Sequence, residues 1–182
     1  MQFLEKDLED IIFEALQTEE GRSELLIKGF PYVADNPIVH RQFRIQGYGI
    51  ADLIIVTENN GKYFIKIIEL KKDKIGISAV EQICTYKNGI DNILINLLQV
   101  PIEDIDIDIQ LILIGEDIKQ GNFIYVTEQI QNLSIFKFKI SLSGLNFTEV
   151  NTSRGHWCQI SFDEKVDFSY FLKLPKEIKI NG

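Results

Sequence analysis

Two carboxylates and a lysine in the first half of the chain have types and spacing that could support metal-dependent chemistry. Glu69 and Lys71 stand two residues apart in the apolar segment 62–71, and alternate residues of a strand project from the same face. Asp52 lies about as far before the Asn-Gly turn signal at 60–61 as Glu69 lies after it, so a hairpin would bring the two carboxylates together. Adjacent carboxylates repel unless a cation lies between them, and Mg²⁺ prefers oxygen ligands.

The lysine adds a positive charge to this pair. Lys71 could hold an attacking water or stabilise charge on a phosphate, so the three side chains contain the parts needed to hydrolyse a phosphodiester. A structural interpretation stays open beside this one. Glu69 and Lys71 could be a solvated ion pair at the edge of a strand, which is a common arrangement that contributes little to stability.

A second pair follows on the next predicted element. The segment 77–98 predicts a long helix, on which Gln82 and Tyr86 share a face because they are four residues apart. Such a pair could reach over a site at the end of the preceding strand. It is also typical of an ordinary helix face.

The elements expected around these residues form one α/β domain. Gly-rich and Pro-rich signals predict mostly loop for 18–37, with a short turn of helix. The strand at 62–71 is apolar on both faces, which predicts a central place in the sheet. The remaining expected elements are a helix at 3–17, strands at 38–46, 50–58, 105–115 and 134–141, and a short helix at 122–131. The last 30 residues contain a tryptophan and several other aromatic residues, so we expect them to pack on the domain.

These motifs together resemble those of a known family. Asp52, followed by Glu69-Leu70-Lys71, resembles the signature of the PD-(D/E)XK nuclease superfamily. The segment QICTY at 82–86 is similar to the QxxxY element of its RecB-like and NucS-like branches, and LEKDLEDII at 4–12 resembles the acidic helix that precedes the core there. The resemblance covers about residues 3–115, and residues 116–182 would form a C-terminal extension of the same domain. It implies a restriction-endonuclease-like core, in which helices flank a central mixed β-sheet in α-β-β-β-α-β order.

The resemblance also implies a metal site. Asp52 and Glu69 would be ligands of Mg²⁺ or Mn²⁺, helped by the backbone carbonyl of Leu70. Glu5 would match the additional acid of the first helix, with Glu9 one turn on as its rival. Taken alone, these two glutamates are best explained as solvated charges at a helix N-terminus, where acids suit the helix dipole.

The activity that the resemblance implies is that of a Mg²⁺-dependent endonuclease acting on DNA. Lys71 would position or activate water, while Gln82 and Tyr86 would orient the DNA backbone or the lysine. The residue before Asp52 is Ala51, where the family motif has proline. A non-catalytic module that binds nucleic acid or protein is the alternative function, as is a nuclease subunit that works in a homodimer or with a partner subunit.

Composition limits the class of protein. The 182 residues are 45% hydrophobic and 25% charged, which is normal for a soluble globular domain. No apolar run is long enough to span a membrane, the N-terminus is unlike a signal peptide, and the two cysteines form no zinc motif, so we expect a cytoplasmic protein without a disulfide framework.

The net charge of −8 argues against a protein that binds DNA through bulk charge. The charge is unevenly distributed, however, because five lysines fall within one short segment. A local basic patch is therefore expected there: Lys62, Lys66, Lys71, Lys72 and Lys74.

Overall fold

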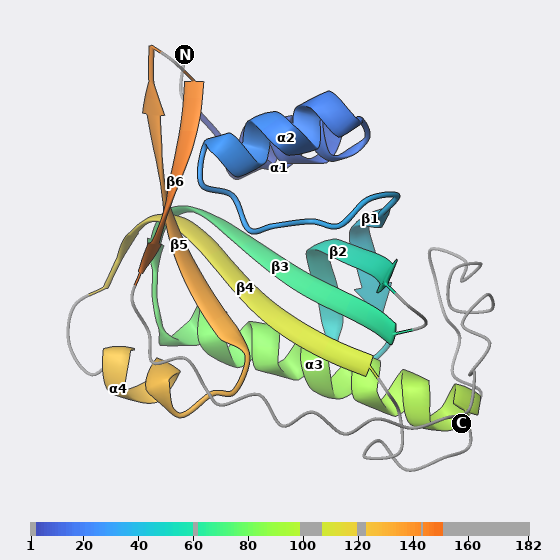
Figure 1. Ribbon diagram of the computed structural model, residues 1–182. Helices are drawn as coiled ribbons and strands as arrows, with labels where there is room; N and C mark the ends of the chain where they lie inside the picture. The colour runs from blue at the N-terminus through green and yellow to red at the C-terminus, as the bar shows by residue number, and fades with distance from the viewer. Residues whose placement is uncertain (1–2, 60–61, 99–106, 120–122, 143, 151–182) are drawn as a thin grey trace.

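Six strands form one mixed sheet whose spatial order follows the chain, β1-β2-β3-β4-β5-β6 (Figure 1). The computed structural model describes residues 3–59, 62–98, 107–119, 123–142 and 144–150. Strands β3 and β4 are parallel, as are β4 and β5, and the other neighbours are antiparallel. The strands are β1 (Ile38–Ile45), β2 (Gly49–Asn59), β3 (Lys62–Ile75), β4 (Ile107–Ile118), β5 (Leu133–Ser141) and β6 (Gly144–Val150).

Helices cover both faces of the sheet. Figure 1 shows α1 (Glu5–Leu16) and α2 (Glu19–Ile27) on one side and α3 (Ile77–Leu98) on the other, with the short α4 (Phe123–Glu128) near the beginning of α3. This is the α/β architecture that the sequence predicts, a mixed sheet flanked by helices. Within the described ranges, no helix has the length and apolar content needed to cross a membrane.

Strand β3 is central because its side chains alternate between two hydrophobic cores. Ile65 and Ile67 pack in the core beneath α3, whereas Ile68 and Leu70 pack in the core beneath α1. All four are at most 1% exposed. A strand that is apolar on both faces has no side to present to water, so both faces of the sheet must be covered, here by α1 on one side and α3 on the other.

Several predicted boundaries differ from the structure. Strand β4 ends at Ile118, three residues beyond the predicted end at 115, and α4 ends at Glu128, three residues before the predicted end at 131. The sequence predicts that the third strand ends near residue 71, whereas β3 continues to Ile75 after a shift of register between Lys71 and Lys74. Strand β6, which is not among the predicted strands, begins at Gly144 with a φ of +101°. The helix at 77–98 lies where it is predicted. The predicted turn at 60–61 and the C-terminal residues 151–182 lie outside the described residues.

The segment 18–37, predicted as mostly loop, contains the nine-residue helix α2. Its N-cap is Thr18, whose Oγ1 accepts a hydrogen bond of 3.0 Å from the backbone N–H of Gly21. Gly21, one of the residues that suggest a loop here, allows two helices to pack closely instead. A Cβ at Gly21 would lie 2.2 Å from the carbonyl oxygen of Ala15, so only glycine permits this close turn between α1 and α2.

A glycine within α3 makes a testable contribution to the fold. A Cβ at Gly89 would lie 2.4 Å from Cγ2 of Ile45 and 2.7 Å from Cγ of Tyr48. Gly89→Ala should therefore lower the free energy of unfolding by about 1–3 kcal/mol through overpacking, although alanine ordinarily favours a helix. Urea denaturation measures this change. The neighbouring exposed Asn88→Ala is the control and should be neutral or stabilising, and a stabilised Gly89→Ala variant would contradict the packing argument.

Candidate active site

The two carboxylates of the predicted site lie close together on β2 and β3. The regular pairing of these strands ends at Leu53 and Ile68, and Asp52 and Glu69 are the next residues along the two strands. The negative charge of Asp52 is felt at Glu69, where it helps to raise the pKa. The antiparallel register of β2 and β3 brings the two residues together.

Glu69 is a buried acid at the centre of the sheet. Its side chain is 2% exposed, and Oε1 lies 2.5 Å from Nζ of Lys71. Burial, and then the charge of Asp52, raise the pKa of Glu69 to about 7. The alternative of a solvated ion pair at a strand edge is therefore wrong, because β3 has neighbours on both sides and Glu69 is shielded from water.

One oxygen of this carboxylate has no hydrogen-bond partner. Within the part of the chain that the structure describes, Oε2 of Glu69 is buried and accepts no hydrogen bond. A buried polar atom without a partner costs about 1–3 kcal/mol, more when it is charged, so its retention calls for an explanation. A cation or a ligand donor at this oxygen would supply one.

Lys71 stays positively charged in this environment. Burial alone would lower its pKa, but the hydrogen bond that it donates to Glu69 and the charges of Glu69, Glu5 and Asp52 together raise it above the usual value. The ammonium group therefore acts as a hydrogen-bond donor and a positive charge at neutral pH.

Asp52 is held by two hydrogen bonds. Its Oδ2 accepts from the backbone N–H of Leu70 at 2.7 Å, and its Oδ1 accepts from Nε2 of Gln42 at 3.2 Å. Burial raises the pKa of Asp52, the Leu70 hydrogen bond and the charge of Lys71 lower it, and the charge of Glu5 adds to the rise. The net direction is upward. Both carboxylates of the pair thus resist ionisation when no cation compensates their charge.

The two acids of α1 have different surroundings. Oε2 of Glu5 accepts a hydrogen bond of 3.1 Å from the backbone N–H of Lys72, at the end of the Glu-Leu-Lys segment. The charge of Glu5 acts on Asp52, Glu69 and Lys71. Glu9 is 5% exposed and pairs with Arg41. The geometry thus favours Glu5 over Glu9 as the acid of α1 that faces the carboxylate pair.

Gln82 and Tyr86 come from α3, which packs on the sheet face toward which Glu69 projects. Nε2 of Gln82 donates to the hydroxyl oxygen of Tyr86 at 2.5 Å. Burial chiefly raises the pKa of Tyr86, whose side chain is 2% exposed, and the charges of Glu69 and Asp52 add to this rise. The hydroxyl therefore lies within electrostatic reach of the site.

A glycine on β2 makes room for this tyrosine. Gly49 has a φ of +126°, and a Cβ there would lie 2.7 Å from Cε1 of Tyr86. Any other residue would displace the ring. The Gly-Tyr-Gly segment at 47–49 lies between the predicted strands 38–46 and 50–58. In addition to separating these strands, it leaves room for the ring of Tyr86.

The carboxylates of Asp52 and Glu69 suit a metal ion that takes only a few ligands from the protein. No group of three or more His, Cys, Asp or Glu side chains in the described ranges is arranged to hold a metal ion. Mg²⁺, however, is usually bound through one or two carboxylates together with water and substrate phosphates. The Asp52–Glu69 pair, with its unpartnered buried oxygen, fits that smaller set of oxygen donors.

The lysines of segment 62–74 do not all converge on the site. Lys66 donates to Oε1 of Gln110, and Lys74 pairs with Asp117 at 3.4 Å. Lys71, by contrast, forms an ion pair with the site carboxylate of Glu69. The alternation of the strand explains this, because residues at even and odd positions project from opposite faces.

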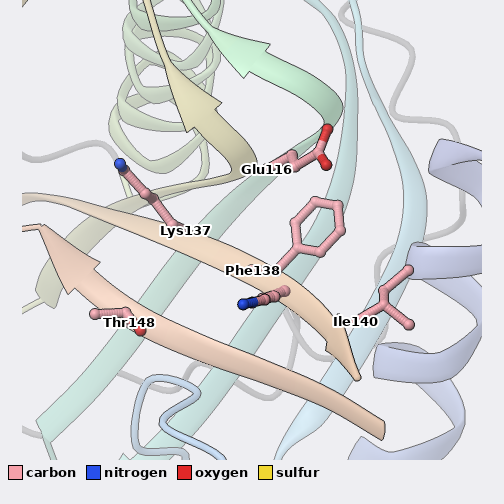
Figure 2. Close-up of a pocket in the computed structure, with 6 residues that line it drawn as sticks. Glu116, Lys137, Phe138, Ile140 and Thr148 are labelled. Atoms are coloured by element: carbon pink, nitrogen blue, oxygen red, sulfur yellow. The ribbon is translucent and has the colours of Figure 1, made fainter. Parts of the chain in front are cut away.

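A separate hollow of about 560 Å³ lies where β4, β5 and β6 meet. Figure 2 shows residues around it, which include Glu116, Lys137 and Phe138. None of the predicted site residues lines it, so this hollow is no part of the carboxylate site.

Sequence reasoning misses Gln42 and Arg41. Gln42 bonds Asp52, and Arg41 bonds Glu9, so both connect β1 to the acids of the site. No sequence signal identifies either residue, since a glutamine and an arginine in an amphipathic strand are ordinary surface residues.

The comparisons with known proteins give a distant structural likeness. No family model and no curated protein matches the sequence. The crystal structure of a repair endonuclease from Pyrococcus abyssi aligns with 75% of this chain and 47% of that chain, with a TM-score of 0.46 and 21% sequence identity. This chain therefore spans about half the length of that protein. A likeness of this size carries no argument about activity, so the function proposed below rests on the geometry of the site.

The raised pKa of Glu69 makes stability depend on pH. Between its ordinary pKa of 4.5 and about 7, the folded protein holds the Glu69 proton more tightly than the unfolded chain does. The free energy of unfolding in EDTA should therefore decline across this window as pH rises, by up to about 3 kcal/mol relative to Glu69→Gln. Urea denaturation of both proteins at a series of pH values measures the difference.

Asp117→Asn is the control for this experiment because its shift has the opposite sign. The hydrogen bond from Lys137 chiefly lowers the pKa of Asp117 to about 2. That group stabilises the fold above its ordinary pKa of 3.8 and loses the effect as pH falls through about 2. Asp117→Asn should therefore change the pH dependence of the free energy of unfolding only at acid pH. The same pH dependence in wild type and Glu69→Gln from pH 4.5 to 7 would refute the burial argument.

Proposed function

We propose that this chain is a Mg²⁺- or Mn²⁺-dependent endonuclease that hydrolyses phosphodiester bonds in DNA, of the PD-(D/E)XK type with a QxxxY helix. The observation that supports the proposal most directly is the buried carboxylate of Glu69, which lies beside Asp52 and Lys71 and leaves one oxygen without a partner among the described residues. Perturbed acids of this kind gather at functional sites.

The metal would be held by Asp52, Glu69 and the carbonyl of Leu70, with Glu5 as the additional acid from α1. When bound, Mg²⁺ would supply Lewis-acid stabilisation of the phosphate and favour deprotonation of the attacking water. The N–H of Leu70 already fixes one oxygen of Asp52, which limits rotation of that carboxylate. The burial of Glu69 excludes bulk water and strengthens its attraction to a cation.

Lys71 would act as a donor in this reaction. Its raised pKa keeps it protonated, so it would orient the attacking water by a hydrogen bond or neutralise charge that develops on the phosphate. The ion pair with Glu69 holds the ammonium group at the site before substrate binds. Gln82 and Tyr86 would orient the DNA backbone or this lysine from α3.

The competing function is a non-catalytic module on the same fold, or a subunit that cuts only in a homodimer or with a partner. The net charge of −8 favours help from another chain in DNA binding. A module without catalysis has no evident need for a buried carboxylate pair, because an apolar pair of similar volume would cost less.

The first test is cleavage of supercoiled plasmid, a single-stranded oligonucleotide and a branched duplex, with Mg²⁺, Mn²⁺ or EDTA. Metal-dependent cutting by wild type is expected, with a loss of at least about 100-fold in Glu69→Gln and Asp52→Asn because the metal loses a charged ligand. Asp73→Asn is a matched control, since Asp73 is an exposed acid of β3 with a 76% exposed side chain. Cutting that survives Glu69→Gln, or no cutting of any substrate by folded wild type, would reject the assignment to a self-sufficient nuclease.

Lys71→Met should separate metal binding from catalysis. In the absence of metal, Lys71 occupies Oε1 of Glu69, so its removal frees an oxygen and removes a repelling charge. Above the pKa of Glu69, the variant should bind Mn²⁺ about threefold to tenfold more tightly, as measured by calorimetry, and yet cut at least about 100-fold more slowly.

Lys74→Met is the control for the effect of charge alone, because Lys74 pairs with Asp117 instead. It should change Mn²⁺ affinity less than twofold, in line with a weakly interacting surface charge. Weaker Mn²⁺ binding by Lys71→Met would contradict the competition that the ion pair implies.

A further inference from the structure

Gln42 has a backbone conformation that glutamine rarely adopts. Its φ is +48°, in the left-handed region, which disfavours side chains other than those of glycine, asparagine and aspartate. Strain of this kind persists where the surroundings fix it, and it gathers at functional sites. Gln42 lies in β1 at the position where the register on either side places it opposite Asp52.

The side chain of Gln42 bridges two acids. Nε2 donates to Oε2 of Glu9 at 2.6 Å and to Oδ1 of Asp52 at 3.2 Å. Glu9 is fixed in turn, because Arg41 donates to its other oxygen and also pairs with Asp10. The amide of Gln42 therefore connects a firmly held, nearly buried carboxylate on α1 with the exposed side of the Asp52 carboxylate.

The bridge fixes the orientation of Asp52. The backbone N–H of Leu70 binds Oδ2, and the amide of Gln42 binds Oδ1. Two donors on the two oxygens define the plane of the carboxylate, whereas one donor would allow it to turn. A neutral amide is also the appropriate spacer, because a second acid at this position would add repulsion to the charges that Glu5 and Glu9 exert on Asp52.

We propose that Gln42 is a positioning residue of the metal site, which orients Asp52 through a bridge anchored on Glu9. This inference rests on the function proposed above. It gives Glu9 a role distinct from that of a metal ligand, since both of its oxygens already accept hydrogen bonds from Arg41 and Gln42. The strained φ at Gln42 places the amide between the two acids.

The test uses Gln42→Gly, which removes the bridge and relieves the left-handed strain in one change. If Gln42 positions Asp52, the melting temperature in EDTA should stay close to that of wild type, while Mn²⁺ affinity measured by calorimetry should fall about tenfold. Gln42→Asn should lose affinity similarly. Asparagine tolerates the same φ, but its side chain is one methylene too short to reach both carboxylates.

Two further measurements separate positioning from a merely structural role. Asn36→Gly is the matched control, because Asn36 has a φ of +52° in an exposed turn and should leave Mn²⁺ affinity unchanged. In metal-free protein, the amide proton resonance of Leu70 should move upfield in Gln42→Gly and Gln42→Asn as its hydrogen bond to Asp52 weakens. It should not move in Asn36→Gly.

The outcomes distinguish this inference from the proposed function. Wild-type Mn²⁺ affinity and an unmoved Leu70 resonance in Gln42→Gly, together with loss of binding in Asp52→Asn, would overturn the positioning role and leave the nuclease proposal standing. Failure of the wild type to bind Mn²⁺ would overturn both. If Gln42→Gly does not fold, Gln42→Asn decides: weakened binding at an unchanged melting temperature supports the role, and wild-type affinity rejects it.

Discussion

The burial of one carboxylate at the centre of the sheet is the constraint on which the site depends. Glu69 is 2% exposed, lies near the charge of Asp52, and has Lys71 as the compensating charge on its own strand. The raised pKa of Glu69 expresses the cost of this placement. An apolar side chain would satisfy the core at this position with less strain on the fold. The proposed metal site would account for the charge, and the same position that lowers stability would give the carboxylate a strong attraction for a cation.

The elements around Glu69 each contribute something that the carboxylate requires. The central position of β3 buries it, and the hairpin with β2 supplies Asp52. Helix α1 covers one face of the sheet and brings Glu5 to the end of the Glu-Leu-Lys segment, where it binds the N–H of Lys72. Helix α3 covers the other face and approaches β1 closely at Gly89, while Gly49 of β2 leaves room for the ring of Tyr86. The register shift after Lys71 ends the regular pairing just beyond the site, a common place for such irregularities.

The features that the sequence predicts correctly follow from local hydrophobic patterns and from the spacing of residues along the chain. The central strand follows from its two apolar faces, α3 from its helical period, and the meeting of Asp52 with Glu69 from their equal distances to the turn. The remainder depends on contacts between distant segments. Helix α2 is missed because Gly21 serves the packing of two helices, which no local rule reports. The bridge from Glu9 to Asp52 is missed because it joins residues more than thirty positions apart through an unusual φ at Gln42.

An acidic chain can act on a polyanion if the charge is balanced where the two meet. Three carboxylates at the proposed site (Glu5, Asp52 and Glu69) and one ammonium group (Lys71) leave two negative charges, which one divalent cation would cancel. Without the cation, a phosphate would meet net repulsion, and the carboxylates themselves would tend to hold protons, as their raised pKa values indicate. Metal and DNA would therefore bind cooperatively, each lowering the electrostatic cost of the other. The net charge of −8 is then compatible with a nuclease, because affinity for DNA would depend on the occupied metal site and not on the surface as a whole.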